Sequence, residues 1–106
     1  MSNLKIKWSL YAKNSLDIIV DYIKQDSPEN AKMVKQTLIN LVGTLSDFPD
    51  KYPLDPFIKA EKGNFRFISK WNFKIVYEIT DVEIIIIDIF HTAQSPEKIN
   101  KALIDD

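Results

Sequence analysis

The chain has 106 residues, of which 45% are hydrophobic and 27% are charged, a balance that excludes a disordered protein and allows one modest core. It contains no cysteine, which excludes disulfide bonds and any metal site or nucleophile built on a thiol. Its formal net charge is −1, so it lacks the strong positive charge that draws proteins to nucleic acids. We expect residues 1–106 to form a single domain.

The sequence carries no sign of an export signal or a membrane span. The first residues, MSNLKIKWSLYAK, lack the apolar core of a signal peptide. The longest apolar run, residues 84–87, is far shorter than the roughly 20 residues that cross a membrane. We therefore expect a cytoplasmic protein with no membrane partner.

The N-terminal part of the chain predicts a strand and then a helix. Residues 4–8 alternate between apolar and basic side chains, which is the period of a half-buried strand. Ser9 has the chemistry of a helix N-cap, because its hydroxyl can accept a bond from a free backbone N–H. Apolar residues then recur with helical spacing and end near Lys24.

A second helix follows almost at once. Ser27-Pro28-Glu29 supplies an N-cap, a proline at the first helical position and an acid in the first turn. The apolar stripe after it continues for about five turns, with Gly43 tolerated inside it, until Pro49 ends the helix. The connection between the two helices is so short that they should pack as an antiparallel hairpin.

The second half of the chain changes in character from helical to extended. Residues 49–63 read as a loop with three prolines, and three β-type runs follow at 65–70, 73–79 and 83–90. Their connections are short enough for antiparallel hairpins. The last run is apolar on both faces, which indicates a central strand. Ser95-Pro96-Glu97 repeats the helix-start chemistry and predicts a short C-terminal helix.

These elements predict an α+β fold. Strands and helices segregate along the chain, so the helical hairpin should pack on one face of a small, mostly antiparallel sheet. No later element is long enough to cover the other face. We therefore expect that face to present a groove.

A basic stretch precedes and enters the predicted strands. It contains a single acid, Glu61, and suits an anionic ligand or an acidic protein partner. A solvated strand face is the alternative reading. The five candidate partner-binding residues are Lys59, Lys62, Arg66, Lys70 and Lys74.

The residue inventory excludes several kinds of chemistry. One histidine and no cysteine leave no cluster of metal ligands, so we expect no metal and no cofactor. No serine lies in the context of a nucleophile elbow. The two glycines, Gly43 and Gly63, cannot form a glycine-rich phosphate loop.

Metal-independent acid–base cleavage of RNA is still allowed by the residues present. It needs a base for the 2′-hydroxyl, a cation for the phosphate and an acid for the leaving oxygen. Arg66 is suited to clamp a phosphate, and His91 to transfer a proton near neutral pH. On weaker grounds, Lys62 or Lys59 would add positive charge and Glu61 would serve as base.

Each of these residues also has a structural reading. His91 follows the last predicted strand and can simply hydrogen-bond the next turn. Arg66 lies within a predicted strand and can form an ordinary surface ion pair. Aromatic residues that alternate in strands, such as Phe65 and Phe67, are more typical of a core than of a base-stacking platform.

Taken together, the sequence resembles the RelE/ParE superfamily of toxins from bacterial type II toxin–antitoxin modules. The resemblance spans about residues 4 to 99 and is carried by four segments: WSLYAKNSLDIIVDYIKQDSPENAK, LSDFPDKYP, GNFRFISKWNFKIVYEI and IIIIDIFHTAQSPEKI. It implies a helical hairpin on a small antiparallel sheet. It also implies a growth-inhibiting toxin of the plasmid-stabilisation type, neutralised by a cognate antitoxin that wraps the hairpin and the second sheet face.

The resemblance leaves two targets open. RelE-like toxins cleave mRNA on the ribosome, whereas ParE-like toxins bind DNA gyrase. Arg66 matches the arginine of the family's strand, and His91 matches a histidine found after the last strand in many members. The net charge, the single arginine and the absence of any tyrosine after Tyr77 favour the ParE-like side. A ribosome-dependent endonuclease using Arg66 and His91, and an inactive binding module, are the alternatives.

Overall fold

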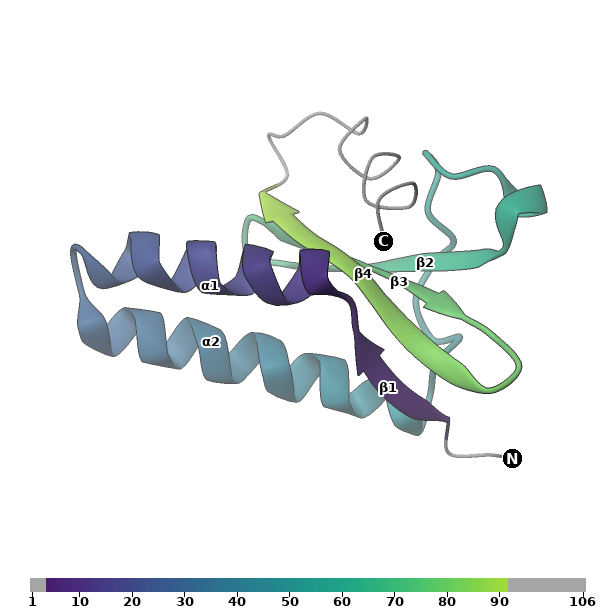
Figure 1. Cartoon of the computed structure of the whole chain (residues 1–106), viewed down its shortest axis with the longest axis horizontal. Helices are drawn as coiled ribbons and strands as arrows, with labels where there is room; N and C mark the ends of the chain where they lie inside the picture. Colours follow the sequence, from purple (N-terminus) through teal and green to yellow (C-terminus); the bar gives the residue numbers. More distant parts are fainter. Residues whose placement is uncertain (1–3, 92–106) are drawn as a thin grey trace.

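The computed structural model describes residues 4–91; residues 1–3 and 92–106 lie outside the described part. The predicted helix that begins at Ser95 falls among the latter. Helices and strands follow one another in the predicted order along the described chain (Figure 1). Their bounds are β1 Lys5–Trp8, α1 Leu10–Lys24, α2 Pro28–Gly43, β2 Asn64–Lys70, β3 Phe73–Ile79 and β4 Glu83–His91, with short 3-10 turns at Thr44–Ser46 and Ala60–Lys62.

The strands form one sheet in the order β1-β4-β3-β2. Strands β2, β3 and β4 form an antiparallel meander, and β1 pairs with β4 in parallel. The prediction of an α+β fold with a mostly antiparallel sheet is therefore confirmed. The prediction that the last strand is central is also confirmed, because β4 lies between β1 and β3.

Serine caps begin both helices, as the sequence predicts. Ser9 Oγ accepts a hydrogen bond from the backbone N–H of Ala12 at 3.0 Å, and Ser27 Oγ accepts one from Asn30 at 3.1 Å. Ser9 Oγ also donates a bond of 2.8 Å to the carbonyl of Ile87. The first cap therefore fixes α1 against β4 as well as starting the helix.

The predicted extent of the second helix was wrong at its C-terminal end. Helix α2 ends at Gly43, and a 3-10 turn over Thr44–Ser46 follows. The Thr44 hydroxyl donates a bond of 2.6 Å to the carbonyl of Leu41, which competes with regular helical bonding where glycine already weakens the helix. Leu45 is nevertheless fully buried, so the apolar stripe marks the core correctly although the helix changes type.

The main core lies between the helical hairpin and one face of the sheet. Figure 1 shows α1 and α2 running side by side, with β4 crossing next to α1. Leu16, Leu38 and Val42 from the helices meet Ile75 and Ile86 from the sheet. This packing is the amphipathic arrangement that the helical spacing predicts.

The second face of the sheet is less bare than the sequence suggested. A separate apolar cluster lies there, made of Ile58, Phe65, Val76, Ile87 and Phe90. Ile58 comes from the loop that precedes β2, so this loop covers part of the face. The expectation that this face presents an open groove was therefore wrong for the part that the loop covers.

Candidate functional site

The basic stretch is divided between the two faces of the sheet. Arg66 lies opposite Tyr77 in the antiparallel register, and Tyr77 belongs to the core on the helix side. Lys74 lies opposite Phe90, which belongs to the cluster on the other side. Side chains of paired residues share a face, so Arg66 and Lys74 point in opposite directions. They cannot contribute to one continuous basic surface.

The guanidinium of Arg66 binds the loop that precedes β2. Its Nη1 donates hydrogen bonds to the carbonyl of Tyr52 at 2.6 Å and to that of Asp50 at 3.3 Å. Its Nε donates to Oδ1 of Asn64 at 3.0 Å. The structure thus shows neither the surface ion pair nor an arginine held free to grip a phosphate.

The ammonium of Lys74 is enclosed on the other face. It forms an ion pair of 2.9 Å with Asp55, and the side chains of Lys74 and Asp55 are 11% and 0% exposed. The rings of Phe67, Phe57 and Phe90 surround the same nitrogen, with centroids 4.6, 4.9 and 5.9 Å away, close enough for cation–π attraction. Little of this charge is left for a partner.

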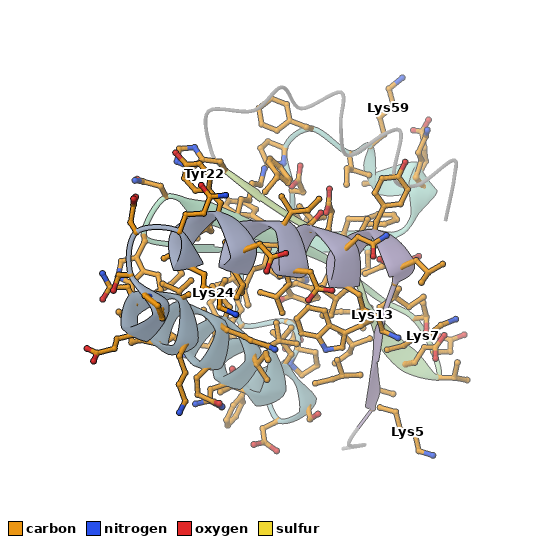
Figure 2. The ribbon with its side chains drawn as sticks, turned by 60° about the vertical axis from the view of Figure 1, so that its left-hand side comes forward. Lys5, Lys7, Lys13, Tyr22, Lys24 and Lys59 are labelled. Carbon is orange, nitrogen blue, oxygen red and sulfur yellow. The ribbon has the colours of Figure 1, made fainter. Side chains whose placement is uncertain are left out.

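The other candidate partner-binding lysines lie at the surface. Lys59 and Lys62 are exposed, and Figure 2 shows Lys59 pointing away from the body of the protein. Lys70 is half-buried, with its ammonium 5.0 Å from the centre of the Trp71 ring. Trp71 has a positive φ of 54° in the tight turn between β2 and β3. These lysines remain candidates for partner contact.

His91 lies far from Arg66. It is the exposed last residue of β4, with its ring edge-on to Phe73 at 5.9 Å between centroids. His91 pairs with Phe73 and Arg66 pairs with Tyr77, on opposite sides of β3. Four residues of strand and two strand spacings therefore separate them, about 16 Å between Cα atoms. With Arg66 bonded to the loop and the His91 ring packed on Phe73, the two side chains do not converge on one phosphate in this arrangement.

The weaker catalytic candidates lie at Arg66's end of the sheet. Glu61 and Lys62 belong to the exposed 3-10 turn immediately before β2 begins at Asn64. His91 lies at the opposite end, because its partner on β3 is the first residue of that strand. The structure thus groups Arg66 with Glu61 and Lys62 at one end and leaves His91 at the other.

Two buried acids were missed by the sequence reasoning. Asp88 is fully buried in β4, where its Oδ1 accepts bonds from the Ser15 hydroxyl at 2.5 Å and from the Ile89 N–H at 2.8 Å. Its signal was visible, since a single acid interrupts a run of isoleucines. Asp55 lies in a proline-rich loop and gave no such signal.

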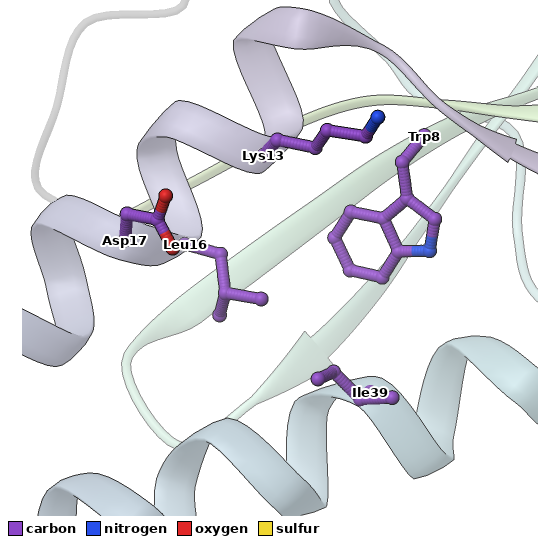
Figure 3. A pocket seen from close by; sticks show the side chains of 5 residues that line it. All are labelled: Trp8, Lys13, Leu16, Asp17 and Ile39. Carbon is purple, nitrogen blue, oxygen red and sulfur yellow. The ribbon is translucent and has the colours of Figure 1, made fainter.

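A pocket of about 320 Å³ opens between the hairpin and β1. Figure 3 shows Trp8 from β1, Leu16 from α1 and Ile39 from α2 around it, with Lys13 and Asp17 from α1 beside them. Apolar walls with two opposite charges at one side suit an apolar side chain carried on an amphipathic segment.

Metal sites and membrane spans were sought in residues 4–91. No group of three or more histidine or acidic side chains there could hold a metal ion. None of the helices in this range is long and apolar enough to cross a membrane.

Comparisons with known proteins find a matching family and a similar solved structure. The model of the family described as the ParE toxin of the type II toxin–antitoxin system parDE matches residues 6–96. A solved structure of the chromosomal ParDE system from P. aeruginosa is similar at 25% identity and a TM-score of 0.68, over 84% of this chain and 96% of that chain. No curated protein matches.

The fold and the family match together identify the class of protein to which this chain belongs. A helical hairpin on a four-stranded, mostly antiparallel sheet is here the fold of a RelE/ParE superfamily toxin. Within that superfamily, the chain belongs to the ParE toxin family of type II toxin–antitoxin systems.

Proposed function

We propose that this chain is a cytoplasmic, growth-inhibiting toxin that a cognate antitoxin neutralises, and that it acts by binding an essential protein, DNA gyrase, rather than by cutting RNA. The observation that carries the proposal is the strand register, which by ideal strand spacings separates Arg66 from His91 by about 16 Å. Acid–base cleavage needs its cation and its proton donor around one phosphate.

The contacts of Arg66 support the same conclusion. Its Nε and Nη1 already donate to Asn64 and to the Tyr52 carbonyl, so a phosphate gripped through these two atoms would have to displace both bonds, the second of which holds the loop. The net charge of −1 also provides no general attraction to RNA, which is a polyanion. Both features suit a protein target better than a nucleic acid.

The pocket between the hairpin and β1 supports the proposal of an antitoxin. Its walls include Ile39, which is 37% exposed, and the half-buried Trp8. An amphipathic helix that lays its apolar face across the hairpin would cover these side chains. Its charged residues would meet Lys13 and Asp17.

Induction of the protein in bacteria, with transcript ends mapped and plasmid supercoiling measured in parallel, tests the mode of action. We expect growth to stop, supercoiling to change and no codon-aligned cuts to appear. Codon-aligned cuts that disappear in both Arg66→Ala and His91→Ala would instead establish an RNA-cleaving toxin. Harmless expression without any antitoxin would establish an inactive binding module.

Co-expression with the protein encoded by the adjacent gene tests the antitoxin surface. We expect this protein to restore growth with the wild-type toxin and to fail with Ile39→Asp. Met33→Asp is the matched control, because Met33 is a 50% exposed apolar residue of the same helix that does not line the pocket. Equal rescue of both variants would remove the pocket from the proposed antitoxin surface.

A further inference from the structure

Residues 49–58, here called the strap, pass around the outer edge of β2 from one face of the sheet to the other. At its start, the Tyr77 hydroxyl donates a bond of 2.6 Å to the carbonyl of Pro49 on the helix side. Near its end, Asp55 pairs with Lys74 on the opposite side. The strap is therefore fastened on both faces of the sheet.

Between these two points, the strap takes the place of an edge strand. The N–H of Asp55 donates to the carbonyl of Phe65 at 2.9 Å, and the N–H of Phe67 donates to the carbonyl of Pro53 at 3.2 Å. Leu54 forms an antiparallel bridge with β2 between them. These bonds satisfy backbone groups that would otherwise be open for pairing with another chain.

The strap buries only part of its apolar surface. Leu54 and Phe57 are each 55% exposed, Tyr52 is half-buried against the main core, and Ile58 alone among these side chains is buried. A segment with few buried apolar contacts opens at a lower free energy than the core of the same domain. The polar contacts of the strap must therefore account for much of its closure.

Among these contacts, the ion pair between Lys74 and Asp55 is the most buried. Asp55 Oδ2 receives the ammonium, while its Oδ1 accepts the N–H of Phe57 at 2.8 Å and so shapes the strap itself. Breaking a buried pair by removing one partner is strongly destabilising, because the other charge is left without compensation. The aromatic rings around Lys74 exclude water. The charge left behind by removal of either partner would therefore cost more than it would at the surface.

We propose that the strap opens and closes as one unit, separately from global unfolding, and that the pair between Lys74 and Asp55 is its latch. In the open state, the backbone groups of Phe65 and Phe67 are exposed along the edge of β2. The strap thus guards this edge against pairing with a second copy of the chain.

Hydrogen exchange in Lys74→Met tests the latch. The matched control is Lys70→Met, since the ammonium of Lys70 lies over the Trp71 ring in the adjoining turn. We expect the amides of Asp55, Phe57 and Phe67 to exchange at least about tenfold faster in Lys74→Met than in the control. Amides in the β3–β4 ladder should change only as far as global stability changes. Equal acceleration of strap and ladder amides, or no acceleration, would overturn the latch.

Exchange of the wild-type protein in low urea gives an independent test that needs no folded variant. Strap amides should exchange with little dependence on urea, because local opening exposes little surface, whereas ladder amides should depend on it steeply. The same urea dependence for strap and ladder amides would overturn separate opening.

Light scattering tests whether the strap protects the edge of β2 from pairing with a second copy of the chain. Lys74→Met should form larger species as concentration rises, while Lys70→Met keeps the wild-type size. Faster exchange of the strap amides in Lys74→Met without larger species would overturn the proposal that the strap prevents self-association.

Discussion

The carboxyl group of Glu78 shows how a single residue sets a pH dependence. Glu78 is half-buried on β3, and burial raises its pKa. Its Oε2 lies so close to Gly63 that a Cβ on that glycine would be 2.8 Å away, and Gly63 has a φ of +141°. A raised pKa means that the folded protein holds the proton more tightly than the unfolded chain. Ionisation of Glu78 therefore costs stability as pH rises through its folded-state pKa.

We predict that Glu78→Gln is more stable than the wild type at pH 7, because the variant carries no charge to desolvate. The difference should shrink as pH falls and vanish below about pH 4, where the glutamate is protonated in both states. Urea unfolding over a series of pH values measures it. Glu61→Gln, which makes the same change at an exposed position, is the matched control. A stability difference that is independent of pH would contradict the explanation.

At the scale of elements, the sequence predicted what local chemistry determines. Ser9 and Ser27 were recognised as caps because a cap depends only on its own residue and the next three. The end of α2 was misjudged, because the change to a 3-10 turn depends on where the Thr44 hydroxyl bonds rather than on periodicity. The parallel pairing of β1 with β4 joins Lys5 to Glu83, and no local pattern encodes a partner so distant.

We predict that Ser9→Ala destabilises the protein by about 2 kcal/mol, since it removes an N-cap and a buried bond to β4 together. Ser27→Ala should cost about 1 kcal/mol or less, because its hydroxyl caps an exposed helix start and makes no second bond. Equilibrium unfolding in urea compares the two variants. Equal losses would show that the Ser9–Ile87 bond adds nothing to the cap.

The candidate site, too, was predictable only where local chemistry determines it. Arg66 and His91 were selected as catalytic candidates, and Lys74 as a partner-binding candidate, from their residue types and positions. Their partners were not predictable, because the strap brings Asp55 to Lys74 across 19 positions of sequence without any periodic signal. The distance between Arg66 and His91 likewise follows from the strand register, which spacing in sequence alone does not give.

At the scale of the whole molecule, the fold uses its single arginine and one enclosed lysine to hold itself together. The guanidinium of Arg66 and the ammonium of Lys74 both fasten the strap. The surface that remains combines an apolar pocket on the hairpin with scattered exposed lysines such as Lys59. This combination suits recognition of proteins, and it adds to the separation of Arg66 from His91 in support of a protein target for this member of the ParE toxin family.

Supercoiling of relaxed plasmid by purified DNA gyrase, with the toxin added in increasing amounts, tests the central claim most directly. We predict that supercoiling falls as toxin is added and recovers when the antitoxin is added in excess. Lys24→Ala, at the exposed C-terminal end of α1, serves as a variant that should inhibit like the wild type. Undiminished supercoiling, together with cleavage of mRNA in a purified translation reaction, would contradict the account.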